Sequence, residues 1–304
     1  MKYRFHVVYS REAQRWMGEI LGLALMDCLR EMGFEATCTL GPPMAPESAD
    51  NLDAFIFMGL ESIGVMGQGW PRLGPVFLYN AAETDEDHRF WRAWRRRLAR
   101  NYEHTDVRLD AILDYSRNNR DKLRKIGFEK IDLPIGFHER FDFAQPRWPY
   151  AFSFIGRVHP DSRRHQMLAG ICRRWPSHFV QARGDRNYFS MTREGLCLQG
   201  YQAPVTIQLN RDGKANNFAS CRVIMMGMSN RQAVVNERSS WWPECLRDDL
   251  WVNSPTERVM KDAEALIDEP ARAKEMGERA YEVIRAEYRL QDHVETAMKE
   301  FGIL

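Results

Sequence analysis

The sequence lacks several patterns that identify common classes of protein. Its six cysteines form no C-x-x-C pair and no zinc-ligand spacing, and most stand in apolar segments. This usage is typical of reduced core thiols in the cytosol. No apolar run approaches the ~20 residues of a membrane-spanning helix, and the polar residues 1–10 do not resemble a signal peptide. These absences predict a soluble cytoplasmic protein without a metal site.

The sequence also lacks an excess of one charge. Lys and Arg number 43 against 42 Asp and Glu, so no dominant basic field indicates a nucleic-acid-binding protein. No predicted strand is followed by G-x-G-x-x-G, which argues against a nicotinamide dehydrogenase. Internal repeats and low-complexity tracts are absent as well.

What is present is an alternation of short apolar segments with helix-like segments. A chain of 304 residues, 44% of them hydrophobic, has enough material for about two domains. Strands are predicted at 5–9, 36–40, 54–59, 75–80, 130–138, 150–155, 178–181, 205–209, 232–236 and 250–253, and a further strand followed by a polar loop is predicted within 111–119. Continuous apolar strands between helices predict an α/β protein whose parallel sheets are covered by helices.

Helix signals complete this pattern. Helices are predicted at 12–32, ended by Gly33, at 163–174, and at 218–228. Another is predicted from Ser254, as N-cap, to Asp268, and a long terminal helix follows Pro270. Residues 139–149 hold two prolines and no periodicity, and are the predicted linker.

The stretch at 205–214 is the most informative part of the chain. An apolar strand leads into Asn210-Arg-Asp-Gly-Lys214 and then into a helix-like run. Such a strand, loop and helix direct backbone N–H groups and a positive dipole end at one point, where a phosphate can bind. The alternative is an ordinary turn, since Asp-Gly is a common turn dipeptide.

A second unit of strand, glycine loop and helix spans residues 150–174, and its loop begins at Gly156. Its cations are Arg157, Arg163 and Arg164, and an arginine fork pairs with phosphate oxygens bidentately. Two such loops can converge on one ligand at the carboxyl edge of a parallel sheet. Glu237, directly after a predicted strand, is placed to accept hydrogen bonds from ribose or sugar hydroxyls, or is an exposed loop acid.

Residues 89–100 alternate arginine with tryptophan and phenylalanine. This segment suits an acceptor or membrane surface, or nucleic acid bound by stacking and phosphate pairing. The alternative is a helix that packs its tryptophans inward and leaves its arginines in solvent.

The order of these features resembles the GT-B glycosyltransferases. Asp114-Tyr-Ser-Arg-Asn-Asn119, Leu133-Pro-Ile-Gly136 and Phe152-Ser-Phe-Ile-Gly156 are similar to spore-maturation-type proteins with a glycosyltransferase-like domain. Residues 208–252, with Gly227 and Trp241-Trp242, also resemble the protein O-glucosyltransferase and capsule-xylosyltransferase group.

The resemblance implies two Rossmann-like domains that face each other across a cleft. An acceptor-side domain would span residues 1–140 and a nucleotide-sugar-binding domain residues 150–285, with a terminal helix at 286–304 that packs back towards the first domain. It implies a metal-independent transfer of a sugar from a nucleotide sugar to a glycan, protein or small-molecule hydroxyl, with no cofactor. The implied donor-binding residues are Gly156, Arg157, Arg163, Asn210, Asp212, Gly213, Lys214, Asn217, Arg222 and Glu237.

One position departs from the family pattern. Aligning Gly227 with the glycine of Arg-x-x-Glu-x-x-x-x-Gly places Ala219 at the arginine and Arg222 at the ribose-binding glutamate. Either the ribose contact moves to Glu237, or the donor differs, or the site is degenerate. An inverting enzyme also needs a general base, for which Glu12, Glu83, Asp85 and His138 are the candidates, with Glu61 a further acid in a similar place.

Three functions therefore remain open. The first is a glycosyltransferase that transfers a hexose or a pentose. The second is a nucleotide-sugar-binding protein without catalysis, which the missing Arg and Glu would explain. The third is a glycosyltransferase that acts on nucleic-acid bases, for which the segment 89–100 would supply the contact.

Overall fold

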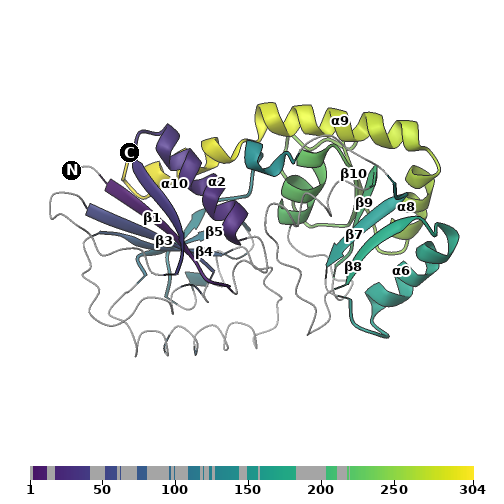
Figure 1. Cartoon of the computed structure of the whole chain (residues 1–304), viewed down its shortest axis with the longest axis horizontal. Coiled ribbons are helices and arrows are strands. Elements are labelled where there is room, and N and C mark those ends of the chain that lie inside the picture. The colour runs from purple at the N-terminus through teal and green to yellow at the C-terminus, as the bar shows by residue number, and fades with distance from the viewer. Residues whose placement is uncertain are drawn as a thin grey trace. The chain divides into compact units, whose positions relative to one another are not determined.

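The computed structural model describes residues 3–11, 18–41, 52–59, 74–80, 109–116, 127–143, 149–156, 158–182, 203–210 and 220–304, with residues 62, 96, 99, 119, 123, 124 and 218. The chain divides into two compact units, each an α/β unit built on a parallel sheet (Figure 1). Unit 1 comprises Met1–Pro134 and Leu290–Leu304, and unit 2 comprises Ile135–Arg289. The predicted α/β class is confirmed.

Unit 1 is built on a six-stranded parallel sheet in the order β2-β1-β3-β4-β5-β6. The strands are β1 (Tyr3–Tyr9), β2 (Glu35–Leu40), β3 (Leu52–Met58), β4 (Val76–Asn80), β5 (Ala111–Asp114) and β6 (Lys130–Asp132). β4 and β5 are buried along their whole length, as expected of strands covered on both faces. Gly33, with a φ of 84°, ends the helix α2 (Gly18–Glu31) in the left-handed conformation that glycine adopts without strain.

Two helices from opposite ends of the chain pack in unit 1. α2 lies on β1 and β2, and α10 (Leu290–Glu300) packs against α2 and β6. Beyond α10, the ring of Phe301 meets that of Phe77 edge to face, with centroids 4.7 Å apart. The buried face of α10, with Leu290, Val294 and Met298, is therefore part of the core of unit 1.

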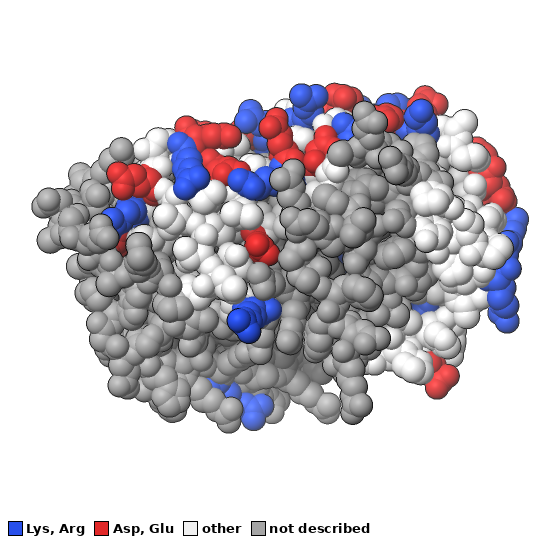
Figure 2. Space-filling view, viewed as in Figure 1, with Lys and Arg blue, Asp and Glu red and all other residues white. Residues whose placement is uncertain are grey.

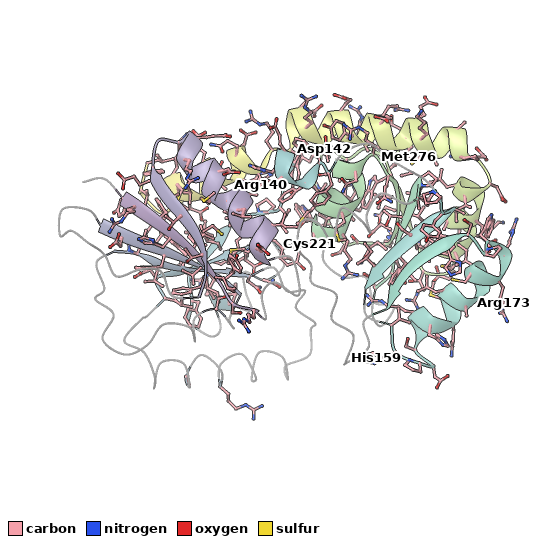
Figure 3. All side chains as sticks on the ribbon, viewed as in Figure 1. Arg140, Asp142, His159, Arg173, Cys221 and Met276 are labelled. Carbon is pink, nitrogen blue, oxygen red and sulfur yellow. The ribbon has the colours of Figure 1, made fainter. Side chains whose placement is uncertain are left out.

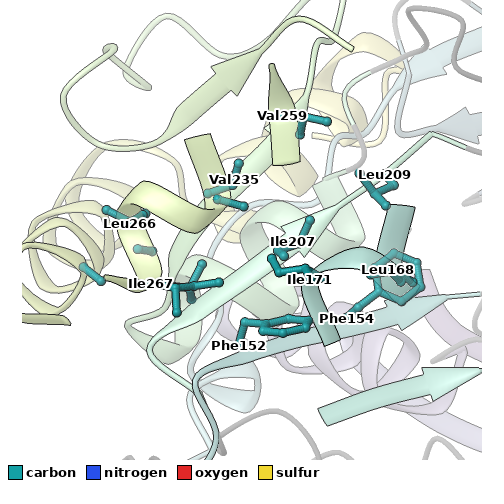
Figure 4. Packing of buried hydrophobic residues seen from close by; sticks show 14 of the residues in the cluster. Phe152, Phe154, Leu168, Ile171, Ile207, Leu209, Val235, Val259, Leu266 and Ile267 are labelled. Carbon is teal, nitrogen blue, oxygen red and sulfur yellow. The ribbon is translucent and has the colours of Figure 1, made fainter. Parts of the chain in front are cut away.

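Unit 2 is built on a five-stranded parallel sheet in the order β11-β10-β9-β7-β8. The strands are β7 (Phe152–Gly156), β8 (His178–Ala182), β9 (Val205–Gln208), β10 (Ala233–Glu237) and β11 (Val252–Ser254). Helices α6 (Arg163–Arg174) and α8 (Val259–Ile267) cover one face, where aromatic and branched side chains from strands and helices interdigitate (Figure 4). Ser162 caps α6 by accepting a hydrogen bond from the N–H of His165.

The opposite face of this sheet carries a π-helix, η3 (Cys221–Gly227), where an α-helix is predicted. Over a single turn, the spacing of apolar residues does not distinguish the two kinds of helix. Gly227 allows the close approach, since a Cβ atom there would lie 2.6 Å from Cγ2 of Val234 and 3.1 Å from Cγ2 of Thr206.

Two other helix predictions are wrong, one in where the helix begins and the other in its continuity. Ser254 does not cap a helix, because it is the last residue of β11 and its carbonyl accepts the N–H of Arg238; a turn follows, and α8 begins at Val259. The single terminal helix is instead two helices, α9 (Pro270–Glu287) and α10. They separate at Tyr288, whose φ and ψ are −138° and 59° and whose carbonyl accepts the N–H of Phe137 at 2.7 Å.

The short 3-10 helix η2 (Glu139–Phe141) and the residues after it pack within unit 2. Asp142 pairs with Arg231 at 3.0 and 3.1 Å and accepts a hydrogen bond from the hydroxyl of Tyr281 on α9 at 2.7 Å. Figure 3 shows Asp142 beside α9. These contacts, made by part of the predicted linker, fix the start of unit 2 to its last helix.

The described surface mixes both charges. In Figure 2, acidic and basic side chains alternate along the edge where α9 runs. None of the helices in the described part of the chain is both long and apolar enough to cross a membrane.

Candidate functional site

The candidate site lies at the carboxyl ends of the strands of unit 2. The chain passes from β7 to β8 on one side and then to β9 on the other side, so the strand order reverses between β7 and β9. In open parallel sheets, ligands bind outside the carboxyl ends of the strands at such a reversal. Gly156 ends β7 and Asn210 follows β9, so two of the predicted residues flank this point.

β7 and β9 diverge before they reach this edge. They pair only at Phe152 with Val205 and at Ser153 with Thr206, although β7 has five residues and β9 has four. Beyond β9, the carbonyl of Leu209 accepts a hydrogen bond from Nη2 of Arg164 at 2.5 Å. The carbonyl of Asn210 accepts from Nε of Arg164 at 3.2 Å and from Nη1 of Arg163 at 3.3 Å. Side chains of α6 thus satisfy carbonyls at the end of β9 where the partner strand no longer does.

Gly156 keeps this opening free of a side chain. A Cβ atom there would lie 2.9 Å from the ring of Phe154 and 3.8 Å from Nη1 of Arg164. Arg164 is itself buried, with its guanidinium 6.0 Å from the centre of the Phe154 ring. Gly156 is therefore required for the present position of the Phe154 ring, whereas a Cβ atom would make only an ordinary contact with Arg164.

Glu237 is the centre of a cluster of four residues, here called the Glu237 cluster: Arg163, Asn210, Glu237 and Thr256. Its Oε2 accepts hydrogen bonds from Nη1 of Arg163 at 3.0 Å and from the N–H of Asn210 at 2.6 Å. Its Oε1 accepts from Nη2 of Arg163 and from the hydroxyl of Thr256 at 2.7 Å. The side chain of Glu237 is 1% exposed. Glu237 is therefore not the exposed loop acid that the sequence left open.

Asn210 is equally well held in the cluster. Its N–H and its carbonyl are bonded as described, and Nδ2 approaches the carbonyls of Glu237 and Arg238 at 3.4 Å each. Asn210 is buried. Its role in the observed structure is to fix the beginning of the loop that follows β9.

Arg222 reaches the same edge from the other face of the sheet. It lies on η3, and its Nη1 donates to Oε1 of Gln208, the last residue of β9, at 2.9 Å. The neighbouring Ile207 and Leu209 belong to the core beneath α6 and α8, whereas Val234 packs on the η3 side. Arg163 and Arg222 therefore flank the end of β9 from its two faces.

Several predicted site residues lie outside the described part of the chain. On the donor side these are Arg157, Asp212, Gly213, Lys214 and Asn217; among the candidate bases they are Glu12, Glu83 and Asp85. Ala219, Glu61 and most of the segment 89–100 also lie outside it. In that segment, only Arg96 and Ala99 are described, and both are exposed.

His138, the remaining candidate base, lies in unit 2. Its Nδ1 accepts a hydrogen bond from the N–H of Arg140 at 3.1 Å, so that it caps η2. Its ring lies 5.8 Å from that of Phe141. Within the described contacts, the side chain stabilises the start of this segment.

A buried carboxylate in unit 1 has no counterpart among the predicted site residues. Asp114 ends β5 and is 0% exposed. It accepts hydrogen bonds from Nδ2 of Asn80 at 2.8 Å, from the N–H of Ser116 at 2.7 Å, and from Nδ2 of Asn119 at 3.0 Å. We call these four residues the Asp114 cluster. The bond to the N–H two residues later is an Asx turn, which the sequence Asp-Tyr-Ser-Arg-Asn-Asn could have suggested.

Burial raises the pKa of Asp114 to about 6, against the hydrogen bonds from Asn80, Ser116 and Asn119 and the charge of Lys130, which lower it. The desolvation of the charged carboxylate outweighs all of these because no formal positive charge contacts it directly. Among all the described residues, no group of three or more His, Cys, Asp or Glu side chains could hold a metal ion.

No family model matches the chain, and no curated protein matches it in sequence. Solved structures do share its fold. Anabaena HepE, in complex with UDP and glucose, has a TM-score of 0.62 at 9% identity, over 98% of this chain and 99% of that one. An α-glucosyltransferase in complex with UDP and a DNA containing an HMU base has a TM-score of 0.56 at 11% identity, over 99% and 98%.

TarM has a TM-score of 0.54 at 10% identity, over 91% of this chain and 57% of its own. The chain thus spans little more than half the length of TarM, but almost the whole of the other two structures. At these identities the likeness shows the fold: an α/β chain with the two Rossmann-like domains of the GT-B class.

Proposed function

We propose that this chain is a glycosyltransferase that moves a sugar from a nucleotide-sugar donor to an acceptor hydroxyl. The observation that carries the proposal is the opening between the ends of β7 and β9, which Arg163 and Arg222 flank. A protein of similar fold, HepE, has been solved in complex with UDP. The donor would bind at this edge of unit 2, with its diphosphate facing the two guanidinium groups.

The chemistry of the reaction agrees with such a site. Negative charge develops on the diphosphate leaving group as the anomeric bond breaks, and preorganised cations stabilise it there. Arg163 and Arg222 lie at this edge, and the sequence predicts Arg157 and Lys214 in the loops that follow the two strands. We propose that these side chains supply the positive charge and that the transfer needs no metal ion.

The acceptor side of the proposal rests on the sequence. We propose that residues 1–140 hold the acceptor, that residues 150–285 hold the donor and that residues 286–304 return to the first domain. A base for an inverting transfer would come from Glu12, Glu83, Asp85 or His138. We also propose that the chain is related to spore-maturation-type proteins or to the protein O-glucosyltransferase and capsule-xylosyltransferase group. The sugar that it transfers would be a hexose or a pentose.

Thermal unfolding with a panel of nucleoside diphosphates and their sugars tests the proposal. A ligand at about 100 times its dissociation constant adds about 2.7 kcal/mol to the free energy of unfolding, which raises Tm measurably. We expect one base to be preferred, the shift to persist in EDTA, and donor turnover to be lost in Arg222→Ala with Tm retained. A panel that leaves Tm unchanged would contradict donor binding, and turnover that stops in EDTA and returns with Mg²⁺ or Mn²⁺ would contradict metal independence.

Two alternatives have observations of their own. Transfer to a nucleic-acid base is favoured by the likeness to the DNA-bound α-glucosyltransferase and by the arginines at 89–100. It predicts DNA binding that weakens steeply with salt. A binding protein without catalysis is favoured by Arg222, which stands at the family's glutamate position. It predicts nucleotide binding without turnover of any nucleotide sugar.

A further inference from the structure

We infer that Glu237 is a positioning residue that aims Arg163 at the phosphate groups of the donor, and that it does not bind ribose. The inference rests on the proposed function, because it assigns a role within the same donor site. It follows from the hydrogen bonds that the Glu237 carboxylate and the Arg163 guanidinium make.

The carboxylate of Glu237 has no capacity left for a ligand. A carboxylate has two oxygens with about four lone-pair sites. Oε1 accepts from Arg163 and Thr256, and Oε2 accepts from Arg163 and Asn210. Four N–H or O–H groups from three residues therefore fill these sites. The residue is also buried. A ribose hydroxyl would have to displace one of these partners.

The guanidinium of Arg163 has capacity left. It carries five N–H groups. The two of Nη1 point at Glu237 and at the carbonyl of Asn210, and one of Nη2 points at Glu237. The remaining two, on Nε and Nη2, are directed the same way along one edge of the group. Among the described residues no contact occupies this edge, and the Arg163 side chain is 26% exposed.

The free edge is suited to a phosphate. Arg4 in unit 1 uses the same two nitrogens to hold both oxygens of Asp53, at 2.7 and 3.2 Å, which shows that this edge binds an anion bidentately. Arg163 is held through Nη1 and one N–H of Nη2, so its rotation is restricted before any ligand arrives. Such preorganisation lowers the entropic cost of binding.

The test compares a ligand that has ribose with one that lacks it. Isothermal titration of UDP, or of the preferred nucleoside diphosphate, and of inorganic pyrophosphate would be carried out on the wild type, Glu237→Gln, Arg163→Lys and the double variant. In Glu237→Gln an NH₂ group replaces one carboxylate oxygen and faces two hydrogen-bond donors. In Arg163→Lys the positive charge stays, but the planar N–H donors of the guanidinium are lost. We expect each single variant to weaken both ligands about tenfold and the double variant to be little worse, because the two residues act as one unit.

The other end of α6 supplies a matched control. Arg174 pairs there with Glu264 at 2.8 Å, so Arg174→Lys, Glu264→Gln and their double variant repeat the same chemistry away from the site. These variants should keep both affinities within about twofold, since surface pairs contribute little. Thr256→Val removes one hydrogen bond from Glu237 and should give a smaller loss for both ligands, which keeps the test valid if Glu237→Gln folds poorly.

The outcomes separate the two proposals. If Glu237→Gln weakens the nucleoside diphosphate and leaves pyrophosphate unchanged, Glu237 contacts ribose and the inference is wrong. Fully additive losses in the double variant would overturn it as well, because the residues would then act independently. A wild type that binds neither ligand would overturn the proposed function itself.

Discussion

Each unit ends one of its buried strands with a carboxylate, and the two carboxylates are held differently. Asp114 ends β5 in unit 1, where its direct partners are the amides of Asn80 and Asn119 and one backbone N–H. Glu237 ends β10 in unit 2, where its partners include the guanidinium of Arg163. Both are almost completely buried, at 0% and 1% exposure.

The different partners indicate different roles: Asp114 stabilises the structure of unit 1, whereas Glu237 also orients a candidate binding residue. Neutral donors hold a carboxylate in place but leave its charge poorly compensated, and so the pKa of Asp114 is raised. A cation from another element compensates the charge and is itself oriented by it. In unit 2 that cation is partly exposed at the edge where a ligand would bind. The first arrangement stabilises a loop, and the second also presents a binding group.

The largest effect is expected from Asp114→Ala. The substitution leaves the side-chain amides of Asn80 and Asn119 and the N–H of Ser116 without their acceptor in the interior, which costs roughly 1–3 kcal/mol per unsatisfied group. We expect a loss of about 3–5 kcal/mol in urea unfolding, with faster hydrogen exchange in β4 and β5. The surface variant Asp268→Ala should lie within about 0.5 kcal/mol of wild type. A similar value for Asp114→Ala would show that the Asp114 cluster does not stabilise unit 1.

The second effect is the pH dependence of unit 1. Because the pKa of Asp114 is about 6 in the folded protein, above the 3.8 of an unperturbed aspartate, the native state holds a proton between pH 4 and 6 that the unfolded chain lacks. The contribution is fully present below pH 4 and is lost as pH rises through 6. Over this window it amounts to about 3 kcal/mol.

Unfolding of wild type and Asp114→Asn, followed by exchange of the β5 amides from pH 4 to 7, measures this contribution. Asparagine cannot ionise, so the difference between the two proteins should change in the wild type's favour as pH falls. A difference that is independent of pH would mean that Asp114 titrates in the native state as it does in the unfolded chain.

A smaller effect is expected from Gly156→Ala in unit 2. The added Cβ would meet the Phe154 ring at 2.9 Å, so the ring would have to shift, at a cost of about 1–3 kcal/mol. Gly170→Ala, on α6 with nothing within 4 Å of its Cβ, is the control and should stabilise by about 0.5–1 kcal/mol. Thermal unfolding of both variants checks the prediction. Equal shifts would show that the end of β7 has room for a side chain.

The smallest effect is expected from Arg174→Ala. This arginine pairs with Glu264 and Asp268 on the surface and lies over the Trp175 ring, 4.3 Å from its centre. Exposed pairs of this kind contribute about 0.2–1 kcal/mol. Urea unfolding should therefore show a change of about 1 kcal/mol or less, which 1 M salt reduces. A loss as large as that of Asp114→Ala would remove the distinction between buried and exposed charge on which the comparison rests.

Much of the architecture could be read from the sequence because it is encoded locally. Short, fully apolar runs such as 54–58 and 76–79 favour strands of a sheet covered on both faces, and α6 begins where predicted, after Ser162, which caps it. Ala280, Ile284 and Met298, which stand on an apolar stripe at helical spacing, are buried for the same reason. The glycine loops after β7 and β9 identified the edge of the sheet where Gly156, Arg163 and Asn210 meet.

The sequence could not decide what depends on partners distant in the chain. The break at Tyr288 is set by Phe137, 151 residues earlier, and the end of β11 at Ser254 is set by its pairing with β10. Likewise, Glu237 reads as a ribose ligand or an exposed acid when only its position after a strand is known. Tertiary structure brings it within reach of Arg163, 74 residues away, and of Thr256. Burial at that meeting point makes the charge pair possible, because a buried carboxylate requires the donors that only other elements supply.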